Sequence, residues 1–194
     1  MHYPLELRFK VFSLAQQFTV RDASGTPIMF VKQKMFRLKE KVEVFVDESQ
    51  QQKLFEINAD SIIDFSASYS FTAADGTPWG AVRRKGMKSL WSAHYDIIEN
   101  NQVAMVLKEE NPWKKVVESI LGEIPVLGFF ALYLINPSYL ISFANGQPAL
   151  RIVKKPSMLE RYFVIEKQAE LEQDDELRAL LSLLMMVLLE KNRG

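Results

Sequence analysis

The sequence predicts a mainly β fold: an antiparallel, closed β-barrel of about twelve strands, threaded by a hydrophobic C-terminal α-helix. Two observations support this prediction. Residues 177–190 are almost entirely apolar, and most of the preceding chain repeats a strand–turn–strand pattern. A helix that is apolar on every side must be buried in protein or in a membrane, and a sheet of about a dozen antiparallel strands must curl, split or close. A barrel closed around the helix meets both requirements.

The apolar helix carries no charge over residues 179–189 and only one polar side chain, Ser182. Asp174, Asp175 and Glu176 precede it and basic residues follow from Lys191, which is the arrangement that the helix dipole favours. The apolar run rises about 16 Å, whereas a bilayer span needs about 20 apolar residues. We therefore predict a central helix over residues 175–191 that is enclosed by protein, and no transmembrane segment.

The strands are indicated by alternation and by polar turns. Residues 5–11 alternate apolar and charged side chains, which is typical of a half-buried strand. Strand–turn–strand units then follow at 18–31, 42–57, 70–82, 94–106 and 139–153. Further short runs at 36–38, 63–69, 89–93 and 162–166 complete a barrel that we place at residues 5–167. The chain is a single domain, 1–194.

Three of the turns share one local pattern, a Gly followed two residues later by a Pro. The pairs are Gly25 with Pro27, Gly76 with Pro78 and Gly146 with Pro148. Gly supplies a positive φ in the turn, and Pro can begin a strand but cannot sit centrally in one. The pattern therefore predicts tight hairpins, each with a Pro at the start of its second strand.

One segment interrupts the hairpins. Pro112 precedes apolar residues at helical spacing, which predict a short helix over residues 113–122. The following apolar run, 124–135, contains Pro125 and Gly128. It is too short to span a bilayer, so we interpret it as a buried segment.

The amino-acid composition argues against several classes of function and of binding site. The formal net charge is zero, with 24 basic and 24 acidic residues, so nucleic-acid binding gains nothing from overall charge and is not expected. There is no cysteine, which excludes disulfides and thiolate metal sites and fits a reducing compartment. The N-terminus has no apolar region of the kind found in secretory signals. We expect a cytoplasmic protein, peripheral to a membrane if it meets one.

Four features together resemble the LURF-one-related proteins: the hairpin series, the 31–39 segment after the first turn, the helix at Trp113 and the closing apolar helix. These proteins share a fold superfamily with the phospholipid scramblases and the tubby C-terminal domain. The resemblance covers nearly the whole chain and rests on this layout and on the strand pair from Lys32 to Lys39. It implies a tubby C-terminal-like barrel around a central hydrophobic helix. Some relatives bind phosphoinositides, and scramblases are linked to calcium and membranes, but this chain lacks a cysteine cluster for palmitoylation.

No catalytic or metal site is predicted. His94 is expected in a strand, and a zinc site without cysteine would need carboxylates that no spacing suggests. The acids between Glu170 and Glu176 lack the Gly-centred loop of a calcium site, and we interpret them as a solvated linker and helix start. No nucleotide-binding or nucleophile motif appears, so we expect a non-enzymatic protein without a cofactor.

Two basic clusters are the candidate binding residues, and clustered Lys and Arg can hold anionic head groups. We expect the first cluster in a hairpin turn after the Trp79 strand and the second on adjoining strands. The first comprises Arg83, Arg84, Lys85 and Lys88, and the second Lys32, Lys34, Arg37 and Lys39, with Lys41 nearby. One hypothesis is a module that reversibly recognises an anionic phospholipid, a phosphoinositide or a membrane surface. The alternative is a scaffold or regulatory domain that binds a protein partner, with both clusters simply solvated.

Overall fold

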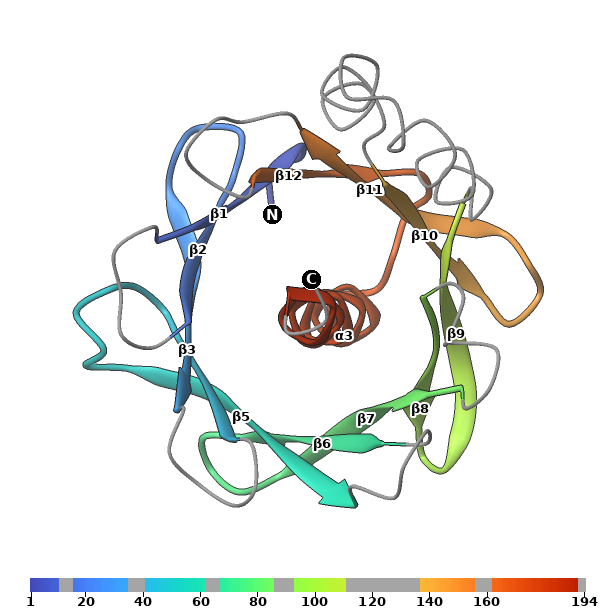
Figure 1. Ribbon diagram of the computed structural model, residues 1–194, viewed down its shortest axis with the longest axis horizontal. Helices are drawn as coiled ribbons and strands as arrows, with labels where there is room; N and C mark the ends of the chain where they lie inside the picture. The colour runs from blue at the N-terminus through green and yellow to red at the C-terminus, as the bar shows by residue number, and fades with distance from the viewer. Residues whose placement is uncertain are drawn as a thin grey trace, which may run out of the picture.

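Twelve antiparallel strands close into a barrel around helix α3 (Gln173–Lys191) in the computed structural model (Figure 1). The structure describes residues 1–10, 16–34, 41–61, 67–85, 93–110, 137–155 and 162–191. Each strand pairs with its neighbours in the chain, and β1 closes the barrel against β12, with Leu5 opposite Ile165 and Arg8 opposite Tyr162. The predicted fold class, a barrel threaded by its C-terminal helix, is confirmed.

The strand bounds agree closely with the predicted hairpins. The strands are β1 Leu5–Phe9, β2 Gln17–Arg21, β3 Pro27–Lys34, β4 Lys41–Phe45, β5 Lys53–Ser61, β6 Ser68–Ala73, β7 Pro78–Arg84, β8 His94–Glu99, β9 Gln102–Glu109, β10 Ser138–Phe143, β11 Pro148–Lys155 and β12 Tyr162–Lys167. The boundary expected between Tyr69 and Ser70 is absent, because both residues lie within β6. The expected strands at 36–38 and 89–92, the short helix at 113–122 and the apolar run at 124–135 lie outside the described residues.

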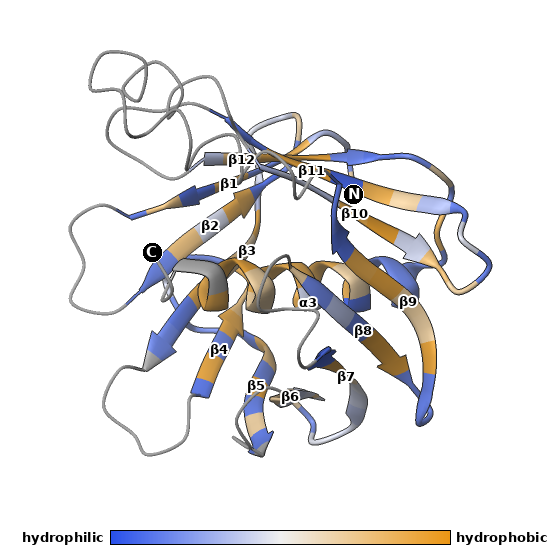
Figure 2. Cartoon of the chain, turned by 45° about the vertical axis from the view of Figure 1, so that its right-hand side comes forward, coloured by the Kyte–Doolittle hydropathy of each residue, from blue (hydrophilic) through white to orange (hydrophobic). Residues whose placement is uncertain are grey.

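The two ends of the barrel differ in their connections. At one end, here called the turn end, the hairpins β2–β3, β4–β5, β6–β7, β8–β9 and β10–β11 turn within a few residues. At the opposite end, here called the far end, strands β1, β3, β5, β7, β9 and β11 finish. Strand β12 finishes at the turn end, so α3 enters the barrel there and runs toward the far end (Figure 2).

The predicted turn chemistry is confirmed. Gly25, Gly76 and Gly146 have φ values of 83°, 91° and 89°, and the prolines that follow them are the first residues of β3, β7 and β11. The turns also receive side-chain support: the Asp22 carboxylate accepts from the backbone N–H of Ser24 and Thr26. Local sequence therefore determines where each of these hairpins reverses.

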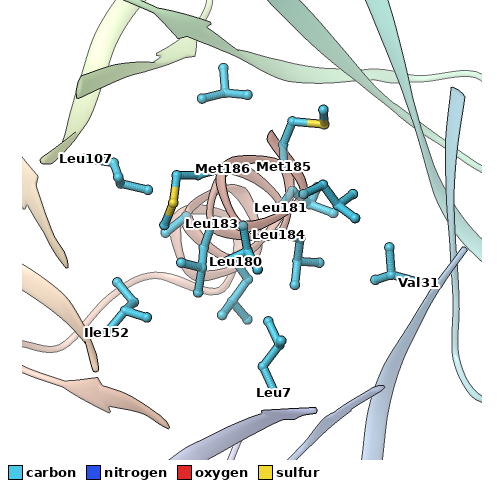
Figure 3. Close-up of a cluster of buried hydrophobic side chains, with 14 of the residues drawn as sticks. Leu7, Val31, Leu107, Ile152, Leu180, Leu181, Leu183, Leu184, Met185 and Met186 are labelled. Carbon is cyan, nitrogen blue, oxygen red and sulfur yellow. The ribbon is translucent and has the colours of Figure 1, made fainter. Parts of the chain in front are cut away.

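The core is formed by the inner faces of the strands and by the whole circumference of α3. Every residue from 179 to 188 is buried. Leucine and methionine side chains of the helix spread toward wall residues such as Leu7, Val31, Leu107 and Ile152 (Figure 3). Ser182, the polar exception, donates its hydroxyl to the Arg178 carbonyl at 2.8 Å, so it carries no unsatisfied donor into the core. Among the described residues, no helix combines the length and apolar character needed to cross a membrane.

Candidate functional site

A buried arginine holds the start of α3 to the barrel wall. Arg178 lies in the second turn of the helix, and its side chain is only 5% exposed. Its Nη2 donates to Glu99 of β8 at 2.7 Å, its Nη1 to Asp175 at 2.7 Å, and its Nε to the Trp79 carbonyl of β7 at 3.1 Å. All three guanidinium nitrogens therefore have acceptors, as a buried cation requires.

Arg178 occupies a gap between two strands. The pairing of β7 with β8 begins only at Ala81 and Ile98, so residues 78–80 have no partner in β8. Gly80 has a φ of 126°, and a Cβ atom there would lie 2.5 Å from the Ile98 carbonyl oxygen and 3.1 Å from the Arg178 Nε. Only glycine fits this position, because the strand and the guanidinium pass it so closely.

Beside this gap lies a pocket of about 570 Å³ on the outside of the wall. Its walls come from β5, β6, β7, the β8–β9 turn and the first turns of α3. Its polar lining residues are Asp60, Ser68, Ser70, Thr77, Arg83, Glu99, Asn100, Asn101, Asp174 and Arg178, with Trp79 as the aromatic member. The volume is within the usual range of small-molecule sites.

The first predicted basic cluster is placed differently from the prediction. Arg83 and Arg84 are the last residues of β7 and do not lie in a hairpin turn. Successive strand residues face opposite sides, so the two arginines are separated: Arg83 is exposed and Arg84 half-buried. Lys85 is engaged by Asp96, Nζ to Oδ1 at 3.0 Å. Lys88 lies outside the described residues.

The second predicted cluster is already engaged where it is described. Lys32 donates to the Gln50 side chain at 3.0 Å. Lys41 lies 2.7 Å from Glu56 and holds the pKa of that carboxyl at about 2, with smaller contributions from Asn58 and Lys53.

The remaining members of the second cluster are only partly placed. Lys34 ends β3, with its side chain outside the description, and Arg37 and Lys39 lie outside the described residues. The described members of the two clusters do not form one patch, because β4, β5 and β6 lie between β3 and β7.

The family comparison extends over much of this region. A family model described as LURP-one-related matches residues 28–123. Residues 28–123 belong to the LURP-one-related family. This stretch runs from β3 through β9 and contains both basic clusters, whereas Asp174 and Arg178 of α3 lie beyond it. No curated protein and no solved structure matches the chain.

Charge among the described residues is divided along the barrel axis. Both predicted clusters belong to strands that finish or begin at the far end. The described charged residues at the far end are Arg8, Lys10, Lys34, Lys41, Arg83, Arg84, Lys85, Lys108, Lys154 and Lys155, against Asp60, Asp96, Glu109 and Glu110. Those at the turn end are Glu6, Asp22, Asp47, Glu48, Asp75, Glu99, Glu166, Glu170, Glu172, Asp174, Asp175 and Glu176, against Arg21, Lys53, Lys167 and Arg178.

One turn modifies this division. The β4–β5 turn folds along the outside of the barrel, so that Glu48 reaches Lys10 with an Nζ–Oε2 distance of 2.6 Å. Lys10 is therefore neutralised locally, whereas the far ends of β7, β9 and β11 keep their excess of basic residues. The chain is thus neutral overall, and its described residues are basic at one end.

Among the acids of the linker and the first helical turn, Glu170, Asp175 and Glu176 each have a contact, and these contacts do not all converge on one point. Glu170 pairs with Lys167 at 2.8 Å, and Asp175 pairs with Arg178. Glu176 is buried beside Tyr3; burial raises the pKa of the Tyr3 hydroxyl, and the Glu176 carboxylate raises it further. In the described ranges, no group of three or more His, Asp or Glu side chains is placed to hold a metal ion.

Sequence reasoning missed Arg178, Gly80 and the pocket beside them. One signal was available: Arg178 is a charged residue just inside a helix that is otherwise apolar, a position that requires buried acceptors. Nothing local indicates that these acceptors come from Glu99 and from the Trp79 carbonyl, because both belong to distant strands.

Proposed function

We propose that this protein is a non-enzymatic binding module that reversibly meets an anionic membrane surface with the far end of its barrel. The observation that carries the proposal is the division of charge between the two ends of a molecule with no net charge. A neutral molecule gains little long-range attraction, but a basic end orients it as it approaches an acidic surface.

The contributors are the cations at the far end, of which Lys85 also pairs with Asp96. Arg83, Lys85 and Lys108 are exposed, and Arg84 and Lys155 are half-buried. Each basic residue near an acidic leaflet contributes about 1 kcal/mol. Four or five such residues correspond to a dissociation constant of about a millimolar. The binding is therefore weak, reversible and sensitive to salt.

Co-sedimentation with vesicles tests this proposal. Wild-type protein is mixed with vesicles of phosphatidylcholine alone or with added phosphatidylserine, at low and at high salt. The test variant carries Arg83→Gln, Lys85→Gln and Lys108→Gln at the far end. The matched control carries Arg21→Gln, Lys53→Gln and Lys167→Gln at the turn end, which removes the same charge from the opposite end.

We expect acidic vesicles to bind the wild type and the turn-end control, and the far-end variant to lose most of this binding. High salt should release the wild type, because the distance over which surface charges act falls from about 10 Å at 0.1 M salt to about 3 Å at 1 M. Equal losses in both variants, or equal binding to neutral and acidic vesicles, would refute the membrane proposal. The alternative, a scaffold for a protein partner, is favoured by the ion pairs that already engage Lys41 and Lys85. It would show as a partner that co-purifies at high salt with both variants.

A further inference from the structure

We propose that the pocket beside Arg178 binds a small zwitterion, a molecule that joins a phosphate or carboxylate to an ammonium group. The inference rests on a different observation from the membrane proposal, although Arg83 takes part in both. It rests on two side chains of opposite charge, Arg83 and Asp174, that line the same pocket and have no hydrogen-bonding or ionic partner among the described residues.

Arg83 supplies the site for the anionic group. It is exposed at the end of β7, with Ser68 of β6 opposite it in register. The nearby carboxylate of Asp60 is occupied, since it accepts from the hydroxyls of Ser70 at 2.6 Å and Ser68 at 3.3 Å. The guanidinium of Arg83 therefore keeps its donors for a ligand, and its planar geometry suits a phosphate or carboxylate.

Asp174 supplies the site for the ammonium group. The other two carboxylates near the start of α3, Glu99 and Asp175, are both taken by Arg178 at 2.7 Å. Asp174 is exposed in the first turn of the helix and remains uncommitted. A ligand cation there meets one free carboxylate without having to displace an existing ion pair.

Trp79 adds an aromatic surface to the same pocket. Its ring is half-buried against Phe55, with centroids 5.7 Å apart, and its Nε1 is buried with no hydrogen-bond partner among the described residues. An ammonium group is attracted to the face of an indole ring, and more strongly where water is excluded.

The charge balance of the pocket selects this class of ligand. The lining carries two guanidinium groups, Arg83 and Arg178, against three carboxylates, Asp60, Glu99 and Asp174. A purely anionic ligand would be repelled by the uncommitted Asp174, and a purely cationic one would be repelled by Arg83. A zwitterion satisfies both, and a pocket of about 570 Å³ has room for one of head-group or amino-acid size.

Titration calorimetry with O-phosphoethanolamine as the probe tests the inference on the full chain. Inorganic phosphate and ethylamine serve as the two half-probes, and β-alanine replaces the phosphate by a carboxylate. The test variants are Arg83→Gln and Asp174→Asn, both at exposed positions. The controls are Arg21→Gln and Glu172→Gln, which carry the same charge changes outside the pocket lining.

We expect one zwitterion per chain, bound more tightly than either half-probe. Each test variant should weaken it about tenfold, because each removes one charge-assisted contact, while the controls bind as the wild type does. A zwitterion that binds no better than phosphate alone, or test variants that match the wild type, would overturn the inference. Neutral vesicles with and without phosphatidylethanolamine then distinguish a lipid head group from a free metabolite.

Failure of this site is distinguishable from failure of the membrane proposal. Asp174→Asn removes a negative charge at the turn end, so it should abolish zwitterion selectivity while leaving binding to acidic vesicles intact. If Asp174→Asn leaves the zwitterion bound as tightly as in the wild type, the pocket inference fails even where the vesicle experiment succeeds.

Discussion

Replacing Arg178 by methionine should loosen the start of α3 from the wall while keeping a side chain of similar length. The change removes two ionic contacts and one hydrogen bond to a backbone carbonyl. The carboxylates of Glu99 and Asp175 are 40% and 29% exposed, so they can return to water, and each contact contributes about 0.5–1 kcal/mol. The Trp79 carbonyl loses the guanidinium donor of Arg178, and an acceptor left without its partner costs about 1–3 kcal/mol. We therefore expect the free energy of unfolding to fall by about 2–5 kcal/mol.

For a domain of this size, that loss lowers the midpoint of thermal unfolding by roughly 4–20 °C. Urea unfolding followed by tryptophan fluorescence measures the free energy directly. The control is Arg8→Met, which removes an arginine that is 52% exposed and pairs with Glu6 at 3.1 Å, and which should cost less than about 1 kcal/mol. If Arg178→Met costs no more than this control, Arg178 does not hold the helix to the wall as inferred.

Two further predictions concern the core and the outer face. Leu184 is fully buried in α3. Leu184→Ala should cost about 3–5 kcal/mol, and Leu184→Arg should leave no cooperative thermal transition, because it buries an unpaired charge; a cooperative melt of the arginine variant would contradict the threaded barrel. The pKa of the Glu56 carboxyl is held at about 2 from a usual value of 4.5, chiefly by Lys41. The Glu56 carboxylate therefore stabilises the fold at pH values above its pKa in the unfolded chain, and this stabilisation is lost as the pH falls from about 5 to 2. Because the side chain is 23% exposed, we expect it to contribute about 1–2 kcal/mol to the free energy of unfolding. Glu56→Gln should remove this part of the acid dependence of the urea midpoint, and an unchanged dependence would show that the ion pair contributes nothing.

The fold was accessible from sequence because its signals are local. Gly25, Gly76 and Gly146 require positive φ, and the prolines after them mark where the next strand begins, so the turns identify the hairpins without knowledge of the rest of the chain. Residues 179–189 are apolar on every side of the helix, so the sequence alone indicates that this segment is buried. Once these two facts are combined, a closed barrel follows from the need to cover the helix.

The site was less accessible, because it depends on register and on contacts between distant elements. Arg83 and Arg84 look like one basic cluster in the sequence, but β7 continues through them and turns them to opposite faces. Whether Lys41 or Lys85 is free depends on Glu56 and Asp96, which are brought beside them by strand pairing. Gly80 lacks the Gly–Pro pattern of the turn glycines, and its need for a small residue appears only when Arg178 is placed.

Because β1 pairs with β12, the barrel can close only when the first and the last strand of the chain meet. Eleven of the strand pairs join neighbours in sequence across shorter or longer connections, but Glu6 must find Val164 across most of the chain, at a high cost in loop entropy. The helix that fills the barrel follows all twelve strands. Until it arrives, the growing sheet has two unpaired edges and an uncovered apolar face, which are the features that drive edge-to-edge association. The finished barrel has no free edges, but the nascent chain keeps its sheet edges and apolar face exposed until the last strand and the helix have formed. Pairing of β12 and insertion of α3 therefore end this exposure.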